Sequence, residues 1–451
     1  MKMTKQNILA AATVLGLAAA VATPATAFEN EFHGAFIAQF INSNFNRTAT
    51  TDYAQIPDIA NPGEFINVGN GTYQPDKANK SLSSSNFVEQ RARLKYIGKA
   101  NNDLKLVTQF ELDYAYWGNS SYGVARNGGG AIGADQINIE TKNIYLDFNP
   151  TKGYNVKLGM MPNNDAFKGI LFDTDMAGLL VSSGNYGKLS PSFGVFRFVD
   201  DSSNKLGSST SDMLMLDAKY ELAPNFKLGG AYYLFLDDTD SNDIKMNVLG
   251  LNAEYSSGNL TLSGFAVYET GSVNNVDVNS FAANVGAAYK VGPGTARAEA
   301  LYVQGSDDGK NSFYAVNGEN GFYNNEMVIL GRDKNAMTTD NSIIFNSGNS
   351  GQGQMGLYLG YDLPVTEKLA TAFNVGFAGI AKKNSSTLDP DNGKYLGTEI
   401  NAEATYTVLK GLTAGVRAGY AMLGSYYDNV TFDGKDPVNP YDIKLMVKYS
   451  F

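Results

Sequence analysis

The last twelve residues constrain the fold of this chain more than any other stretch. From Pro440 to Phe451 the side chains alternate between two faces, which is the period of a β-strand. One face is wholly apolar, with aromatic residues toward both ends: Tyr441, Ile443, Leu445, Val447, Tyr449 and Phe451. No later segment covers this face, so we expect lipid to cover it. Because hydrocarbon cannot satisfy the backbone groups of a free sheet edge, the segment predicts a closed barrel.

Further alternating segments follow the same rule. Phe32, Gly34, Phe36, Ala38 and Phe40 share one face of the first segment, which should close the barrel against the last strand. Several segments end on a tyrosine that continues their apolar face and precedes a short turn: Tyr96, Tyr220, Tyr255, Tyr289, Tyr361 and Tyr406. A tyrosine is half apolar and half polar, so this recurrence indicates one rim of a barrel at the level of the lipid headgroups.

Longer polar connections alternate with these short turns. They are Ile41 to Asn86, Gly118 to Gln136, Pro162 to Asp175, Val199 to Thr210, Asp237 to Asp243, Thr270 to Asn279, Gly305 to Gly353, Lys382 to Lys394 and Gly424 to Asn439. The predicted fold is all-β: a closed antiparallel transmembrane β-barrel of about eighteen strands, with short periplasmic turns and long extracellular loops. Sixteen strands is the alternative, because Ile137 to Phe148 and Leu179 to Phe198 alternate less regularly.

The amino terminus reads as a cleaved signal peptide. Lys2 and Lys5 precede an apolar run from Ile8 to Val21, and Ala25-Thr26-Ala27 is a small-residue cleavage site. The sequence therefore predicts a signal peptide over residues 1–27 and a barrel domain over residues 28–451.

The composition argues against several other classes of protein. Asp and Glu outnumber Lys and Arg by 45 to 35, whereas a nucleic-acid-binding surface is basic. There is no cysteine and only one histidine, His33, which has no recognisable nucleophile and orienting group beside it. The acidic run from Asp237 to Asp243 lacks the glycine and distal glutamate of a calcium loop. We expect no enzyme activity, no cofactor, no metal site and no nucleic-acid partner.

The terminal strand, with its final phenylalanine, resembles that of the outer-membrane porins of Gram-negative bacteria. This resemblance implies export to the outer membrane and recognition of the chain end, including Tyr449 and Phe451, by the barrel-assembly machinery. It also implies contact with outer-membrane lipid and lipopolysaccharide, and a possible homotrimer. The stretch from Leu158 to Ser183 is faintly similar to alginate-export barrels.

Charged residues of the predicted strands fall almost entirely on the face opposite to the apolar one. By parity the inward cations are Arg91, Arg93, Lys95, Lys157, Arg197, Arg297, Arg417, Lys444 and Lys448, and the inward acids are Glu89, Glu111, Asp113, Asp147, Asp217, Glu254, Glu299, Glu399 and Glu403. A charge at mid-bilayer on the lipid face costs about 2 to 4 kcal/mol, so this segregation predicts a watery lumen. Rings of such charges would tune ion selectivity.

The resemblance to general porins implies that the connection after the fifth strand folds inward as a constriction. In Pro162 to Asp175, the apolar run Ile170-Leu171-Phe172 would anchor it to the inner wall. The residues predicted to line the constriction, as opposed rows of charge, are Asp165, Asp173 and Asp175 against Arg91, Arg93, Lys95 and Arg197. This arrangement predicts weak cation selectivity. Alternatively, the longer connection Gly305 to Gly353 plugs the lumen.

The predicted function is passive diffusion of small hydrophilic solutes or ions across the outer membrane. Two alternatives remain open at the level of sequence. One is a substrate-selective channel, and the other is a structural or interaction barrel that supports an extracytoplasmic electron-transfer protein or another partner.

Overall fold

The computed structural model describes residues 28–45, 55–57, 65–67, 84–118, 139–184, 187–200, 206–239, 242–308, 310–314, 323–337, 341–430 and 436–451. The predicted signal peptide, residues 1–27, lies outside this part of the chain, as do portions of several predicted long connections. No helix in the described residues is long and apolar enough to cross a membrane.

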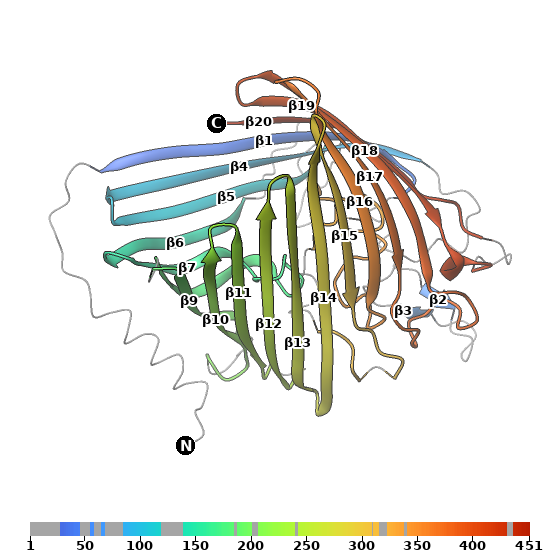
Figure 1. Ribbon diagram of the computed structural model, residues 1–451, viewed down its shortest axis with the longest axis horizontal. Helices are drawn as coiled ribbons and strands as arrows, with labels where there is room; N and C mark the ends of the chain where they lie inside the picture. Colours follow the sequence, from blue (N-terminus) through green and yellow to red (C-terminus); the bar gives the residue numbers. More distant parts are fainter. Residues whose placement is uncertain are drawn as a thin grey trace.

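Eighteen antiparallel strands form one closed sheet, and each pairs with its neighbour in the chain (Figure 1). They are β1 (Glu29–Ser43), β4 (Ser85–Asn101), β5 (Leu104–Tyr116), β6 (Glu140–Thr151), β7 (Tyr154–Asn164), β8 (Asp173–Ser183), β9 (Leu189–Asp200), β10 (Thr210–Ala223), β11 (Phe226–Asp237), β12 (Ile244–Ser257), β13 (Leu260–Val273), β14 (Val276–Val291), β15 (Gly294–Val303), β16 (Gln354–Pro364), β17 (Leu369–Gly379), β18 (Tyr395–Leu409), β19 (Leu412–Leu423) and β20 (Tyr441–Ser450). A separate pair, β2 (Gln55–Pro57) and β3 (Phe65–Asn67), and a 3₁₀ turn, η1 (Ser425–Tyr427), lie in connections. The prediction of an eighteen-stranded all-β barrel is confirmed.

The first and last strands close the sheet, as predicted. β1 pairs antiparallel with β4 on one side and with β20 on the other, so neither edge of the sheet is free (Figure 1). Phe451 extends this seam beyond β20: its N–H donates to the Gly34 carbonyl at 3.0 Å, and the Gly34 N–H donates to the Phe451 carbonyl at 2.9 Å. The ring lies over Gly34, where an added Cβ would stand 2.5 Å from the Cζ atom of Phe451.

The two faces of the sheet follow the predicted parity. On β20, Leu445 and Val447 point outward and are 51% and 46% exposed, whereas Lys444 points inward and is 5% exposed. The tyrosines Tyr220, Tyr255, Tyr289 and Tyr406 are all exposed beside the short turns. The outer wall is therefore a continuous apolar surface suited to lipid, and the charged side chains line the interior.

One predicted long connection is wrong. Thr270 to Asn279 is largely strand, because β13 and β14 are joined only by Asn274 and Asn275, at φ 50° and 64°. A two-residue hairpin of this kind needs two residues with positive φ, which asparagine tolerates better than most residues. The polar side chains around this turn belong to paired strands, not to a loop.

Candidate functional site: two loops inside the barrel

The connection between β7 and β8, residues 165–172, folds into the lumen around Asp165. This carboxylate accepts backbone N–H groups from Phe167 at 2.6 Å, Gly169 at 3.0 Å, Leu171 at 2.6 Å and Phe172 at 2.9 Å. Burial raises the pKa of Asp165 to about 6, while the four N–H donors act to lower it. Asp165 therefore stabilises the shape of the loop from within.

Apolar side chains hold this loop against the wall formed by β11, β12 and β13. Ile170, Leu171 and Phe172 are fully buried, and the Phe172 ring lies 5.3 Å from the ring of Tyr233. Phe167 occupies a space left by Gly250, where an added Cβ would lie 2.3 Å from the Cζ atom of Phe167. The run Ile170-Leu171-Phe172 thus lies where the sequence suggested, against the inner wall.

The predicted constriction of opposed charges does not form. Asp165 is only 5% exposed and does not face a water path. Asp173 and Asp175 belong to β8, where Asp175 accepts from Lys142 at 2.7 Å. β8 lies four strands from β4 in an eighteen-stranded ring, so the two strands are on the same side of the barrel.

Three of the four predicted cations pair with acids on the same or a neighbouring strand. Arg91 and Arg93 of β4 both pair with Glu111 of β5. Lys95 is half-buried on the same strand, in register with His33 and Gln109. Arg197 pairs with Asp212 at 2.8 Å and with Asp200 at 3.3 Å, near the end of β9. The paired cations thus meet acids on the same or the adjacent strand, not across the lumen.

The described residues of the long connection between β15 and β16 (304–308, 310–314, 323–337 and 341–353) also fold inward, on the connection that was the alternative prediction. Glu399 of β18 accepts three consecutive backbone N–H groups from it: Val328 at 2.7 Å, Ile329 at 3.0 Å and Leu330 at 2.7 Å. Gly376 of β17 leaves room for Met327, since an added Cβ there would lie 2.3 Å from the Met327 Sδ. The carboxylate of Glu399 and the space at Gly376 thus fix this turn of the loop against the wall.

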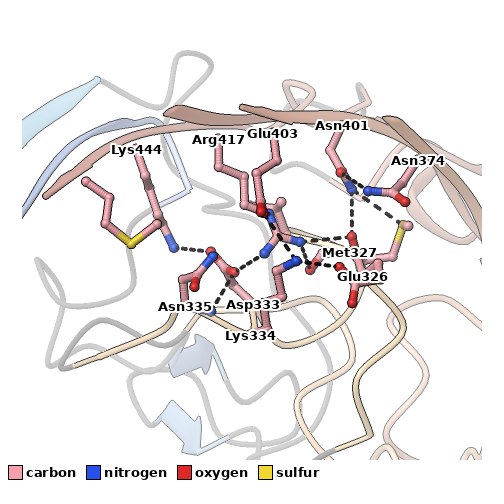
Figure 2. Close-up of polar contacts among 12 residues, drawn as sticks. Glu326, Met327, Asp333, Lys334, Asn335, Asn374, Asn401, Glu403, Arg417 and Lys444 are labelled. Atoms are coloured by element: carbon pink, nitrogen blue, oxygen red, sulfur yellow. Dashed lines mark hydrogen bonds and ion pairs between the residues drawn. The ribbon is translucent and has the colours of Figure 1, made fainter. Parts of the chain in front are cut away.

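A buried ionic cluster, which we name the Asp333 latch, fastens the loop to β19 and β20 (Figure 2). Asp333 pairs with the Arg417 Nη1 at 2.7 Å and with the Lys444 Nζ at 2.7 Å. Burial would raise the pKa of Asp333, but the charges of Lys444 and Arg417 outweigh burial and hold its pKa below the usual range. Asp333 is therefore ionised at neutral pH, and the latch is intact.

Other contacts of the loop extend the attachment on both sides of the latch. Arg417 Nη2 donates to the Glu326 carbonyl at 2.9 Å, and the Gln39 side chain of β1 donates to the Asn335 carbonyl at 2.9 Å. Lys334 lies 2.8 Å from Glu326 and 3.3 Å from Glu403 (Figure 2). The loop therefore follows the inner wall from β15 and β16 past β18, β19 and β20 to β1.

The two inward loops meet each other. The Ser347 hydroxyl donates to the Ile170 carbonyl at 2.6 Å. Both loops also reach Glu299 of β15, whose Oε1 accepts from Lys168 of the first loop at 2.8 Å and from the Tyr323 hydroxyl of the second. Together with apolar side chains of the inner wall, the two loops form a buried hydrophobic cluster that fills much of the lumen.

A polar cavity of about 520 Å³ remains beside them, near the short-turn end of β13 to β16. Small side chains on β13 and β14 leave this space: Thr261, Ser263, Gly286 and Ala288. Its charged lining residues are Arg297, Glu299, Glu326, Lys334 and Asp362. The described residues contain no group of three or more His, Cys, Asp or Glu side chains arranged to hold a metal ion.

Parity predicted that Glu299, Glu399, Arg417 and Lys444 point inward, but not that they hold a loop. Asp333 escaped the sequence analysis because its partners are 84 and 111 residues away in the chain. The available signal was glycine on the inward face of strands, as at Gly250 and Gly376, which marks where another segment approaches the wall.

No protein-family model and no curated protein matches the sequence. The fold is similar to that of solved outer-membrane channels. OccAB4 of Acinetobacter baumannii matches with a TM-score of 0.54 and 13% identity, over 95% of this chain and 100% of that one. OpdK of Pseudomonas aeruginosa, solved with vanillate, gives 0.55 and 12% over 94% and 98% of the chains, as does OccK2 (OpdF) of the same organism, solved with glucuronate. The chain therefore has the fold of Gram-negative outer-membrane porins.

Proposed function

We propose that this protein is a restricted channel of the outer membrane, through which small hydrophilic solutes move passively. The observation that carries the proposal is the closed barrel with an apolar exterior and a charged interior, whose lumen holds two docked loops and a polar cavity. A soluble β-protein of this size would not leave so many large apolar side chains of its strands exposed on the outside. The chemistry is positioning and electrostatic selection, without a reaction.

The docked loops favour a narrow, selective channel over a wide diffusion pore. They are held by buried carboxylates that accept several hydrogen bonds each, so they are built parts of the lumen. The similar structures solved with vanillate and with glucuronate support a role in the passage of small solutes. We also propose that the barrel assembles through the outer-membrane machinery that recognises its last strand, after removal of residues 1–27.

Purified protein in a planar bilayer should give discrete current steps that are proportional to voltage. With two loops in the lumen, each step should be smaller than that of a variant in which residues 323–345 are replaced by a short Gly-Ser linker. In a salt gradient, the reversal potential should indicate a weak preference for cations, because the charged lining of the cavity comprises two cations and three carboxylates. A correctly folded barrel that gives no current steps would contradict the proposal.

A further inference from the structure

The cavity beside β13 to β16 presents carboxylates that are already shaped to hold an ammonium group. The Lys168 Nζ lies 2.8 Å from Glu299, and the Lys334 Nζ lies 2.8 Å from Glu326. Both distances are those of charge-assisted hydrogen bonds. Primary ammonium groups of the protein itself therefore already contact two of the three acids that line this cavity, Glu299 and Glu326.

These internal ammonium groups differ in how firmly they are held. Lys334 lies between two carboxylates, Glu326 and Glu403, whereas the ion pair of Lys168 is with Glu299 alone. The Lys168 side chain is 38% exposed, so its ammonium can move into water at low cost. Glu299 is consequently the carboxylate whose partner a solute can replace.

Arg297, the arginine that lines the cavity, uses its N–H donors on side chains of the barrel wall. The Arg297 Nε donates to Asp362 at 2.6 Å, and its Nη2 donates to Asp362 at 2.8 Å and to Asn374 at 2.8 Å. A bidentate pair of this kind already satisfies the fork of N–H groups that would otherwise receive a carboxylate. Three carboxylates and two cations line the cavity, and Lys168 contacts Glu299 from outside this lining, so moving the Lys168 ammonium away from Glu299 leaves the lining with an excess of acid.

We infer that this cavity is a binding station for small solutes that carry a primary ammonium group, with Glu299 as the acceptor and Lys168 as the group that the solute displaces. The inference rests on the proposed channel function and adds a substrate class to it. The volume of about 520 Å³ accommodates a solute of a few carbon atoms together with water. Both simple amines and zwitterions offer the required group.

Current block in planar bilayers tests this with four-carbon probes. The ammonium probes are n-butylammonium and the zwitterion 4-aminobutyrate, and butyrate offers a carboxylate alone. Each ammonium probe should halve the current of the full-length protein at a concentration about tenfold or more below that of butyrate. The reason is that an ammonium group can donate a hydrogen bond to the Glu299 carboxylate, whereas butyrate cannot. Tetramethylammonium carries the same charge but no N–H donor, so it should block more weakly than n-butylammonium.

Three variants separate a binding role from a structural one. Glu299→Gln should raise the blocking concentration of n-butylammonium, whereas Lys168→Met, which removes the competitor, should lower it. Glu254→Gln is the matched control, because this acid pairs with Lys227 outside the cavity. It should leave the block unchanged. A merely structural Glu299 would not give opposite shifts in Glu299→Gln and Lys168→Met.

Equal block by butyrate, equal block by tetramethylammonium, or block that is indifferent to Glu299→Gln and Lys168→Met overturns the inference. In each of these cases the barrel still conducts, and the proposed channel function stands. A barrel that does not conduct at all removes both.

Discussion

Deleting Phe451 is expected to remove the assembled barrel from the outer membrane. Its backbone makes the last two hydrogen bonds of the β1–β20 seam, and its ring covers Gly34. Without it, the seam exposes unpaired backbone groups to hydrocarbon. Each such group costs roughly several kcal/mol of folding free energy. Phe451→Asp should act similarly, because it places a charge at the same end. The measurement is the amount of heat-modifiable protein in outer-membrane fractions.

Phe451→Tyr keeps the ring and the backbone pairs, so it should assemble at wild-type levels. Refolding into detergent micelles distinguishes a weakened β1–β20 seam from lost recognition by the assembly machinery. A weakened seam lowers the folded yield even in the absence of any assembly machinery, whereas lost recognition lowers it only in cells. Wild-type amounts of the deletion variant, both in cells and in micelles, would show that Phe451 is not needed to close the barrel.

Opening the Asp333 latch should enlarge the channel. Asp333→Ala removes the shared partner of Arg417 and Lys444, which leaves them the longer ion pairs with Glu403 at 3.6 Å and Asp442 at 3.8 Å, so the loss is at most about 3 to 5 kcal/mol. The docked state of the loop should be destabilised, so we expect larger and noisier current steps than those of the wild type. Single-channel recording in planar bilayers measures both properties.

Asp307→Ala is the matched control for this change. Asp307 lies in the same loop, but its ion pair with Lys382 is long, at 3.4 Å, and both side chains are exposed. An exposed pair contributes about 1 kcal/mol or less, so the current steps should not change. If Asp333→Ala gave the same steps as the wild type, the loop would not be what narrows the lumen.

The pH dependence of the latch follows from the lowered pKa of Asp333. Its pKa lies below the ordinary value of 3.8, so its contribution to docking is complete above that value and is lost only as pH falls through the lowered pKa. We therefore expect the size of the wild-type current steps to be unaffected by the latch between about pH 8 and pH 5. Enlarged steps should appear only at strongly acidic pH.

The strands and their facing were predictable from the sequence because lipid imposes them residue by residue. An apolar residue at Leu445 and a charge at Lys444 are dictated by the media on the two sides of one strand. The same holds for the closure of the sheet, since no edge is tolerated in hydrocarbon. The error at Asn274 and Asn275 came from reading polarity as a loop, although two adjacent asparagines are themselves a hairpin signal.

The contacts of the inward-facing charged side chains were less predictable, because they depend on how the loops dock and not on the periodicity of the strands. Asp165 was placed on a water path on the basis of its charge, but it instead accepts four N–H groups of its own loop. Arg91 and Arg93 pair with Glu111 on the adjacent strand, not with a charge across the lumen. The position of the docked loops decides which inward charges meet a loop side chain, as Glu299 meets Lys168 and Tyr323.

Solute flux into liposomes tests the central claim, a restricted channel for small polar solutes, most directly. Liposomes that contain the purified protein should swell in isotonic solutions of small neutral polyols, and the rate should fall steeply toward disaccharides because two docked loops narrow the lumen. Asp333→Ala should swell faster with the larger solutes. Swelling no faster than that of protein-free liposomes, with the barrel correctly folded, would contradict the account.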